Sequence, residues 1–440
     1  MSYSAQRLIS YGEFDVFSID LYDIGLLLAG LIIFIASLLP GLVSEKRLIT
    51  VPIFYMGLGV LVFILPWAPL LPDLVDDVAW LKRVAELGVI LSLTSAGLKL
   101  NSPFAWASWR ISWRLLVLTM PLTVAASAWL GWWAAGLLPA SAILLGAVIS
   151  PTDPVLAGDV EVRAPDEPQG PKTRLFLTTE AGIHNEPERS KTRLALTTEA
   201  GINDSLAFPF TNLAIAVALV GLAPSGWVAG WLAVDVFYKL TVGAVIGAFC
   251  GYLIAKIILS KFMTAMTGVL ALSLTLVPYG FAELASSYGF IAVFVAACVF
   301  RHYERNHQYQ QLVHDFAEQT VRVLVAVLMF FVGAYGSSGA LNMMTPGMWG
   351  VALAIVFLIR PLTSMLALVG SDLSRKQRWA ISFFGIRGIG SVYYLAYGLF
   401  HVDFPDARAL WSIVLAVIII SIVIHGISAP SVMKRLDLGR

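Results

Sequence analysis

Long apolar stretches recur along almost the whole chain, and they constrain its fold more than any other feature. The hydrocarbon core of a bilayer is about 30 Å thick, and a helix of roughly 20 apolar residues spans it. We therefore predict an all-α polytopic membrane protein in which residues 1–440 form a single transmembrane domain of about thirteen helices. The stretches lie near residues 21–43, 49–71, 79–98, 113–136, 138–159, 195–222, 227–259, 264–283, 286–300, 317–336, 347–370, 377–400 and 409–432.

The composition excludes several other classes of protein. Of the 440 residues, 58% are hydrophobic and 13% charged, whereas soluble domains average about 45–50% and about 25%. The formal net charge of +1 indicates neither a nucleic-acid-binding protein nor an acidic tail. Cys250 and Cys298 lie in apolar stretches without Cys/His spacing around them, so we expect neither a disulfide nor a zinc site.

Basic residues are divided unequally between the two sides that this order of spans defines. If the C-terminus is cytoplasmic, 22 of the 29 Lys and Arg residues fall on the cytoplasmic side and four on the other. Loops rich in Lys and Arg face the cytoplasm. We therefore predict a multi-pass protein of the cell (inner) membrane, with the N-terminus outside, the C-terminus cytoplasmic and a cytoplasmic loop at residues 160–194.

The fifth apolar stretch is interrupted by a polar segment that contains two prolines, Pro151 and Pro154. Each proline removes a helical N–H group and disfavours helical geometry in the residue before it. Non-helical backbone at membrane depth is tolerated only inside the protein or beside a water-filled cavity. Thr152 and Asp153 lie within this break, so it indicates a binding site rather than an ordinary kink.

The sixth stretch begins with a second polar cluster. Glu199 and Asn203 are four residues apart and share a helix face, and Asp204 is adjacent. A buried Glu199 requires a cationic partner. Arg360 and Arg387, in later apolar stretches, are the candidates.

A glycine-rich segment, residues 385–390, interrupts the twelfth stretch around Arg387. If spans 1–6 and spans 8–13 are two repeats joined by span 7, the interrupted fifth and twelfth spans correspond. Because a single span links them, the two repeats begin on opposite sides of the membrane and are therefore inverted. Broken helices at matching positions of inverted repeats are typical of the midplane site of a secondary transporter. The residues thus predict two inverted six-helix repeats with two discontinuous helices.

The combined motifs resemble those of one family. Thr152-Asp153-Pro154, Glu199 with Asn203-Asp204, Arg360-Pro361 and Gly385-Ile386-Arg387-Gly388 resemble the NhaP-type branch of the sodium/proton antiporters, within the cation:proton antiporter superfamily. The resemblance extends over essentially the whole chain. It implies a homodimer in the lipid bilayer, with a dimerisation domain and a mobile core domain, that exchanges Na⁺ or Li⁺, sometimes K⁺, for H⁺ without a cofactor.

The resemblance also implies roles for individual residues. Asp204 would carry either the cation or the proton, Asp153 and Thr152 would complete the Na⁺ site, and Asn203 occupies the place of a second aspartate in the electrogenic branch. The chain departs from the pattern at Ala200, where relatives often have a serine that helps to bind the ion. The supporting residues would be Glu199 and Arg360 as an ion pair in the core, Arg387 as a balancing charge at the other broken helix, and Glu86 in the third span as a group that reaches the site.

One carboxylate that alternates between two ions explains the expected exchange. A free aspartate titrates near about 3.9, and burial raises the pKa of a carboxyl group by up to about 3–5 units. Such a group holds either a proton or a cation, but not both. Since Asn203 is neutral, we predict electroneutral 1:1 exchange by alternating access.

Two other functions remain as alternatives. K⁺/H⁺ exchange by the same mechanism is the first. The second is an intramembrane aspartyl protease that uses Asp153 and Asp204 as a dyad sharing one proton. Neither residue lies in the Gly-x-Gly-Asp setting of such proteases, and the protease hypothesis leaves the buried arginines and the helix breaks unused. We therefore expect a protein that is not an enzyme.

A tandem duplication precedes the sixth span. Residues 172–183 recur as residues 191–202, with 11 of 12 positions identical. The second copy is the functional one, because it continues through Asn203 and Asp204 into an apolar helix, whereas Glu180 and His184 of the first copy precede a segment too polar to span a bilayer. The first copy is either an extension that a cytoplasmic loop tolerates, since loop length costs little entropy, or a segment that docks into the core in an inactive register.

Deleting residues 173–191 distinguishes these two hypotheses. We expect the deletion to leave the rate of exchange and its pH profile unchanged, because the remaining chain retains one complete copy before Asn203. The measurement is cation-driven proton release from proteoliposomes over a range of pH. A shifted pH profile in a normally inserted protein would support docking of the first copy.

Overall fold

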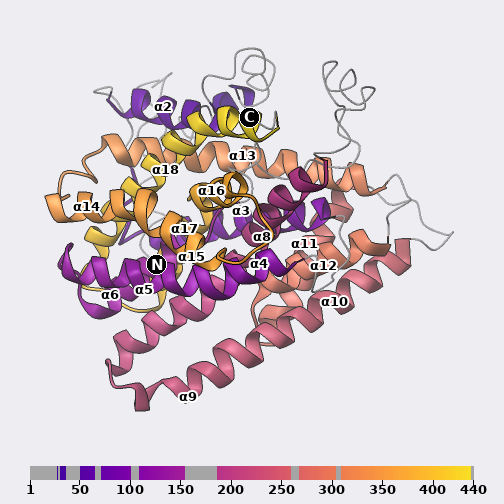
Figure 1. Cartoon of the computed structure of the whole chain (residues 1–440), viewed down its shortest axis with the longest axis horizontal. Coiled ribbons are helices and arrows are strands. Elements are labelled where there is room, and N and C mark those ends of the chain that lie inside the picture. The colour runs from indigo at the N-terminus through magenta and orange to yellow at the C-terminus, as the bar shows by residue number, and fades with distance from the viewer. Residues whose placement is uncertain are drawn as a thin grey trace, which may run out of the picture.

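The computed structural model describes residues 27, 30–35, 50–64, 71–100, 109–153, 186–258, 267–303 and 309–437. Within these residues the regular structure is helical and contains no strand, so the prediction of an all-α fold is confirmed (Figure 1). The count of thirteen spans and the inverted repeats stay predictions. The first copy of the duplicated segment lies outside the described residues, and the second lies in the helix that begins at Glu186.

The helices are α2 Val51–Ile64, α3 Val78–Lys99, α4 Arg110–Arg114, η1 Leu115–Thr119, α5 Met120–Trp133, α6 Pro139–Ile149, α8 Glu186–Val220, η3 Pro224–Gly226, α9 Val228–Gly230, η4 Trp231–Tyr238, α10 Lys239–Ile258, α11 Thr267–Leu284, α12 Gly289–Tyr303, α13 Tyr309–Ser337, α14 Pro346–Ala354, η5 Ile355–Ile359, α15 Arg360–Ala367, α16 Arg375–Phe383, α17 Ile389–His401 and α18 Ala407–Asp437.

Several of these helices join end to end into longer rods. In the described part of the chain, six rods are long and apolar enough to cross a membrane. The shorter apolar helices include α6 and α12. The six are Arg110–Trp133, Ala195–Val220, Val228–Ile258, Leu312–Ser337, Pro346–Ala367 and Ala407–Ser428.

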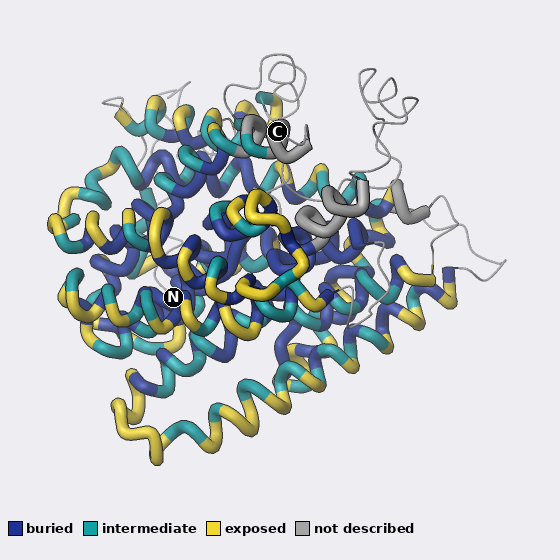
Figure 2. The backbone as a smooth tube through the Cα atoms, in the orientation of Figure 1, coloured by how far each residue is buried: buried dark blue, intermediate teal, exposed yellow. Residues whose placement is uncertain are grey.

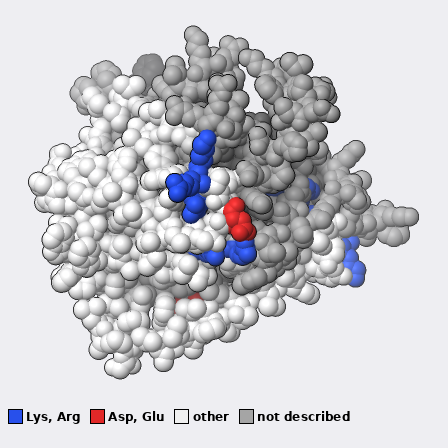
Figure 3. Space-filling view, viewed as in Figure 1, with Lys and Arg blue, Asp and Glu red and all other residues white. Residues whose placement is uncertain are grey.

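The outer surface of the bundle is apolar, as lipid contact requires. Figure 2 shows exposed residues along the outer side of α10 and buried residues in the middle of the bundle. Phe237 of η4 and Val245, Phe249 and Leu253 of α10 are among the exposed residues of the rod Val228–Ile258. On the face seen in Figure 3, the charged side chains of the described residues occupy only small areas. An apolar exterior of this kind, in the described part of the chain, is stable in hydrocarbon and not in water.

The helices pack as two groups. One group consists of α2, α3, η4, α10, α11, α12 and α13, and the other contains α5, α6, α8 and α15, while α17 packs on α3 of the first group and on α6 and α8 of the second. Small residues allow close packing inside the first group: Gly247 and Gly251 of α10 lie directly against the backbone of Ala292 and Ala296 of α12. The two groups meet mainly where α3 packs on α17 and where α8 packs on α12 and η4.

Two rods of the second group share the same local distortion. The π-helical turns η1 and η5 each lead into a helix with proline in its first turn, Pro121 in α5 and Pro361 in α15. Because proline lacks an N–H group, it is tolerated where the regular hydrogen-bond ladder is already interrupted. Two residues after each proline, Thr123 and Thr363 meet with their hydroxyl oxygens 3.0 Å apart. The fourth and eleventh predicted spans are therefore in contact at equivalent positions.

Candidate functional site

The two interruptions predicted from the sequence lie against each other in the core. Helix α6 ends at Ile149, and a second gap separates α16, which ends at Phe383, from α17. The backbone N–H of Asp153 donates to the carbonyl oxygen of Ile386 at 2.9 Å. Each break thus satisfies part of the backbone that the other leaves unpaired.

The Asp153 side chain also bonds to the second break. Its Oδ2 atom accepts a hydrogen bond of 2.9 Å from the backbone N–H of Ile389, the first residue of α17. The first N–H groups of a helix have no partner within the helix, and the helix dipole favours a negative charge there. Asp153 is 4% exposed, so this contact provides stabilisation that water does not.

Asp204 and Asn203 lie beside this crossing, on α8. They are 2% and 1% exposed, respectively. Asn203 donates from Nδ2 to Thr152 Oγ1 at 2.7 Å, which links α8 to the first break. Asp204 lies close enough to Asp153 for the two carboxylates to repel each other. The structure thus brings together the four residues predicted to bind the ion and the proton.

Two oxygens at this site have no hydrogen-bond partner among the described residues. They are Oδ1 of Asp204 and Oδ1 of Asn203. A buried oxygen without a donor is costly, and a bound cation or a proton removes that cost. Carboxylate, amide and hydroxyl oxygens are the ligands that hard cations prefer. The chemistry of this donor set therefore fits an ion that enters and leaves.

Two further residues of the site were not identified from the sequence. Gly390 packs against the Asp204 carboxylate so closely that a Cβ atom at residue 390 would lie 2.6 Å from Oδ1. Tyr394, one turn further along α17, donates a hydrogen bond from its hydroxyl to the backbone carbonyl oxygen of Asp204. The glycine-rich segment marked the break itself, but nothing in the sequence indicated that α17 would contact Asp204.

Glu199 and Arg360 form a buried, bidentate ion pair. Arg360 Nη1 lies 2.6 Å from Glu199 Oε1, and Nη2 donates to Oε2 at 2.8 Å. The side chains of Arg360 and Glu199 are 4% and 3% exposed, respectively. Paired geometry of this kind is the strongest form of arginine–carboxylate contact, and it joins α8 to α15 directly before Pro361.

Arg387 lies in the second break, close to this pair. Gly385 separates the two guanidinium groups: a Cβ atom there would be 3.0 Å from Arg360 Nε and 3.2 Å from Arg387 Nη1. The backbone N–H of Arg387 donates to Ser421 Oγ of α18 at 3.0 Å. Within the described residues, its Nε and Nη1 atoms have no hydrogen-bond partner. Arg387 thus adds positive charge beside Glu199 and Arg360.

Glu86 of α3 is located differently from the other predicted site residues. It is partly exposed, and it accepts a hydrogen bond from the hydroxyl of Tyr279 on α11. The hydrogen bond of Glu86 in the described part of the chain is thus to Tyr279, and not to Thr152, Asn203 or Asp204. That Glu86 reaches the ion site stays a prediction.

A second polar cluster connects the two groups of helices, nearer the end of α8. Asn212, eight residues after Asp204, donates from Nδ2 to Asp235 Oδ1 at 2.7 Å and to the hydroxyl of Tyr288 at 3.0 Å. Asp235 also accepts from Lys239 Nζ at 2.7 Å. Because Asn212 is on α8 and its partners are on η4 and just before α12, this cluster links one group of helices to the other.

An aromatic layer separates the second cluster from Asp204. Phe208, midway between Asp204 and Asn212 on α8, stacks on Tyr288 with ring centres 4.8 Å apart. Other aromatic rings surround it at centre-to-centre distances of 4.9–5.9 Å; they belong to Phe290, Tyr393, Tyr394 and Tyr397. These rings therefore lie between Asp204 and the second cluster along α8.

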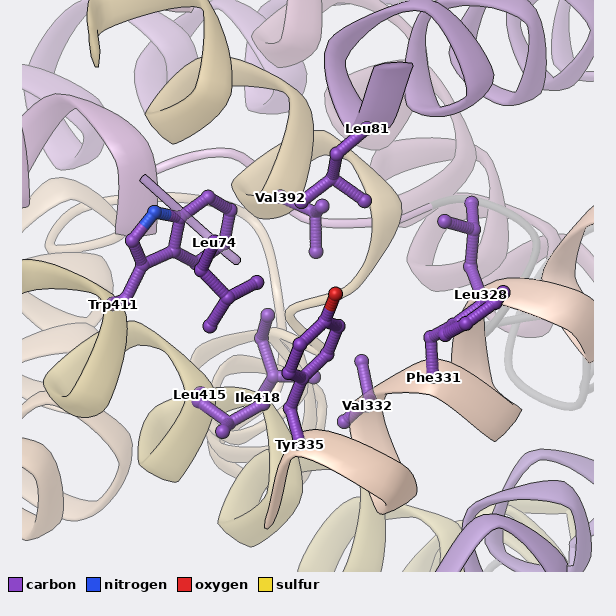
Figure 4. A pocket seen from close by; sticks show the side chains of 10 residues that line it. All are labelled: Leu74, Leu81, Leu328, Phe331, Val332, Tyr335, Val392, Trp411, Leu415 and Ile418. Atoms are coloured by element: carbon purple, nitrogen blue, oxygen red, sulfur yellow. The ribbon is translucent and has the colours of Figure 1, made fainter. Parts of the chain in front are cut away.

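A pocket at the seam between α3, α13, α17 and α18 lacks the chemistry of an ion site (Figure 4). Its lining is apolar apart from the polar atoms of Tyr335 and Trp411, and it contains no acidic side chain. The Tyr335 hydroxyl donates to the carbonyl oxygen of Pro72 at 2.8 Å. The pocket is therefore a gap in the packing between these helices. The candidate ion site is the crossing of the two breaks.

The end of α6 and the gap before α17 meet beside a buried carboxylate, within a lipid-facing bundle, and this arrangement is typical of a membrane transporter. The chain belongs to the sodium/hydrogen exchanger family, whose transmembrane domain matches residues 30–435. This family and the fold are those of a transporter and not of an enzyme, as predicted. Among curated proteins, no sequence matches the chain.

Solved structures confirm the fold. The sodium proton antiporter MjNhaP1 from Methanocaldococcus jannaschii, determined at pH 8, is similar with a TM-score of 0.70 at 17% sequence identity, over 94% of this chain and 99% of that chain. A 3D EM map of the same antiporter gives a TM-score of 0.68 at 18% identity, over 96% and 98% of the two chains. The predicted resemblance to NhaP-type antiporters is thus confirmed.

Proposed function

We propose that the protein exchanges Na⁺ or Li⁺ for H⁺ across the cell membrane, with Asp204 holding one or the other ion in each half of the cycle. The observation that carries the proposal is Asp204 itself, which is 2% exposed and has an unpartnered oxygen at the crossing of the two breaks. Asp153, Thr152 and Asn203 supply the neighbouring oxygens. A proton and a cation cannot occupy the same carboxylate together, and this competition couples their movements.

The charges around the crossing support exchange of one cation for one proton. The buried groups are three carboxylates, Asp153, Glu199 and Asp204, and two guanidinium groups, Arg360 and Arg387. With all of them ionised, one negative charge remains, which a single proton or a single monovalent cation neutralises. A second charge would be buried without compensation, at a cost of several kcal/mol. We therefore propose electroneutral 1:1 exchange.

Alternating access is proposed to come from movement of one group of helices past the other. The two groups meet through α3, α8, α12 and α17, and the aromatic layer around Phe208 lies between Asp204 and the second polar cluster. Movement of one group past the other would require the contacts of Asn212 with Asp235 and Tyr288 to change. We further propose that the protein is a homodimer and that its N-terminus lies outside the cell.

The test is ion-driven proton movement in proteoliposomes. A pH gradient is imposed, its collapse is followed by fluorescence dequenching, and Na⁺, Li⁺ and K⁺ are added in turn. We expect dequenching by Na⁺ and Li⁺, and an unchanged rate when K⁺ and valinomycin clamp the membrane potential.

Each other outcome has a defined meaning. A response to K⁺ alone would keep the mechanism and establish K⁺/H⁺ exchange, the second candidate. A rate that follows the membrane potential would disprove electroneutral exchange. No response to any of the three cations, in protein that is inserted and folded, would contradict cation/proton exchange by this chain.

A further inference from the structure

We infer that Gly390 determines which cations the site accepts, because its missing side chain leaves the space beside the Asp204 carboxylate that the cation needs. The second broken helix would then form a wall of the ion site. This inference rests on the proposed function, which it extends from the residues that bind the ion to the residue that limits its size.

The space at residue 390 is small and directly faces the carboxylate. A Cβ atom would lie 2.6 Å from Asp204 Oδ1, 3.4 Å from Cγ and 3.7 Å from Oδ2. Close carbon–oxygen contacts in proteins are about 3.3–3.6 Å. A methyl group would therefore displace Oδ1 by several tenths of an ångström or take the position of a ligand beside it. Oδ1 is the carboxylate oxygen that has no partner among the described residues.

The backbone of Asp204 is held against the same helix that contains Gly390. Tyr394, on the same helix as Gly390, bonds to the backbone carbonyl of Asp204. The start of α17 is held by Asp153, through the bond to the N–H of Ile389. Helix α17 thus contacts both the backbone and the carboxylate of Asp204, so the wall and the backbone that carries the ligand are held together.

The backbone at residue 390 does not itself require glycine. Gly390 lies in the first turn of α17, and its φ is not among the positive values in the described residues. Alanine is a better helix former than glycine. A Gly390→Ala substitution therefore changes the space beside Asp204 without introducing backbone strain, which makes it a specific probe of that space.

A narrower site should discriminate between cations by size. Ala200, one turn before Asp204 on α8, contributes no side-chain oxygen, so the cation depends on the ligands around Asp204 and on the room left by Gly390. An added methyl group should impair K⁺ and Na⁺ more than the smaller Li⁺. Proton binding needs no such space and should be affected least.

Gly398 provides a matched control on the same helix. It is buried, and a Cβ atom there would lie 2.8 Å from Leu144 Cδ1, the end of a flexible apolar side chain. Gly398→Ala therefore makes the same chemical change in α17, two turns away, and perturbs packing without touching a carboxylate. Its expected effect is equal for all cations.

The experiment measures initial exchange rates in proteoliposomes against the concentrations of Li⁺ and Na⁺ for wild type, Gly390→Ala and Gly398→Ala. For Gly390→Ala we expect the ratio of the apparent KM for Na⁺ to that for Li⁺ to rise by about tenfold, since a misplacement of about 1 Å can cost about a hundredfold. For Gly398→Ala we expect the wild-type ratio.

A second variant keeps the inference testable if Gly390→Ala does not fold. Asp204→Glu leaves Gly390 in place and extends the carboxylate by one methylene group toward the same wall, so the ratio should shift in the same direction. An unchanged ratio in the folded variants, or equal shifts in Gly390→Ala and Gly398→Ala, would overturn the inference. Failure of wild type to exchange any cation would instead contradict the proposed function.

Discussion

Replacing Asp204 with asparagine is expected to abolish cation-dependent proton release while the protein still folds and inserts. The amide has nearly the shape of the carboxylate, but it neither binds a proton at physiological pH nor carries the charge that holds a cation. The loss should be complete within the sensitivity of the assay, because no other described carboxylate beside the crossing has an unpartnered buried oxygen. The measurement is dequenching by Na⁺ and Li⁺ in proteoliposomes.

Asp372 offers the matched control for this substitution. Its side chain is 74% exposed and paired with Arg110 at the surface. Asp372→Asn makes the same chemical change where the charge is solvated, and we expect wild-type exchange. Residual exchange in Asp204→Asn, with normal amounts of inserted protein, would mean that another group carries the ions.

Breaking the pair between Glu199 and Arg360 is expected to cause the largest loss of stability. Arg360→Met would leave the Glu199 carboxylate buried without a partner, and removing one member of a buried ion pair typically costs about 3–5 kcal/mol. The double replacement Glu199→Gln with Arg360→Met should be less destabilising than Arg360→Met alone, because no charge is then left uncompensated. The measurement is thermal unfolding of the purified protein in detergent.

An exposed ion pair gives the control for this second experiment. Arg408 Nη1 lies 3.1 Å from Asp73 Oδ2, with side chains 63% and 36% exposed. Exposed pairs contribute at most about 1 kcal/mol, so Arg408→Met should change the unfolding temperature little. If Arg360→Met were as mild as Arg408→Met, or if the double variant were the least stable, the buried pair would not have the structural role assigned to it.

The helices and the positions of their breaks follow from local properties of the sequence. Runs of about 20 apolar residues form helices in a bilayer wherever they occur. The prolines at 151 and 154 and the glycines around Arg387 interrupt a helix for reasons that involve only neighbouring residues. The helical spacing of Glu199 and Asn203 likewise placed them on one face without knowledge of any partner.

Contacts between distant segments were predictable only in part. The residues alone left both Arg360 and Arg387 as partners for Glu199, and the resemblance to a family selected Arg360. The same resemblance suggested that Glu86 reaches the site, whereas the structure has it bonded to Tyr279 of α11. A charged residue in an apolar span indicates that a partner exists, but the sequence does not indicate which residue the partner is.

The sequence by itself determined that this protein spans a membrane, where two of its helices break, and that Asp153 and Asp204 are buried charges that need an explanation. The tertiary structure decided that the breaks cross, that Asp153 bonds to the first N–H of α17, and that Gly390 packs against Asp204. The physical reason is range: helix formation depends on residues within about one turn, whereas these contacts join segments nearly 200 residues or more apart, whose meeting depends on the packing of the whole bundle.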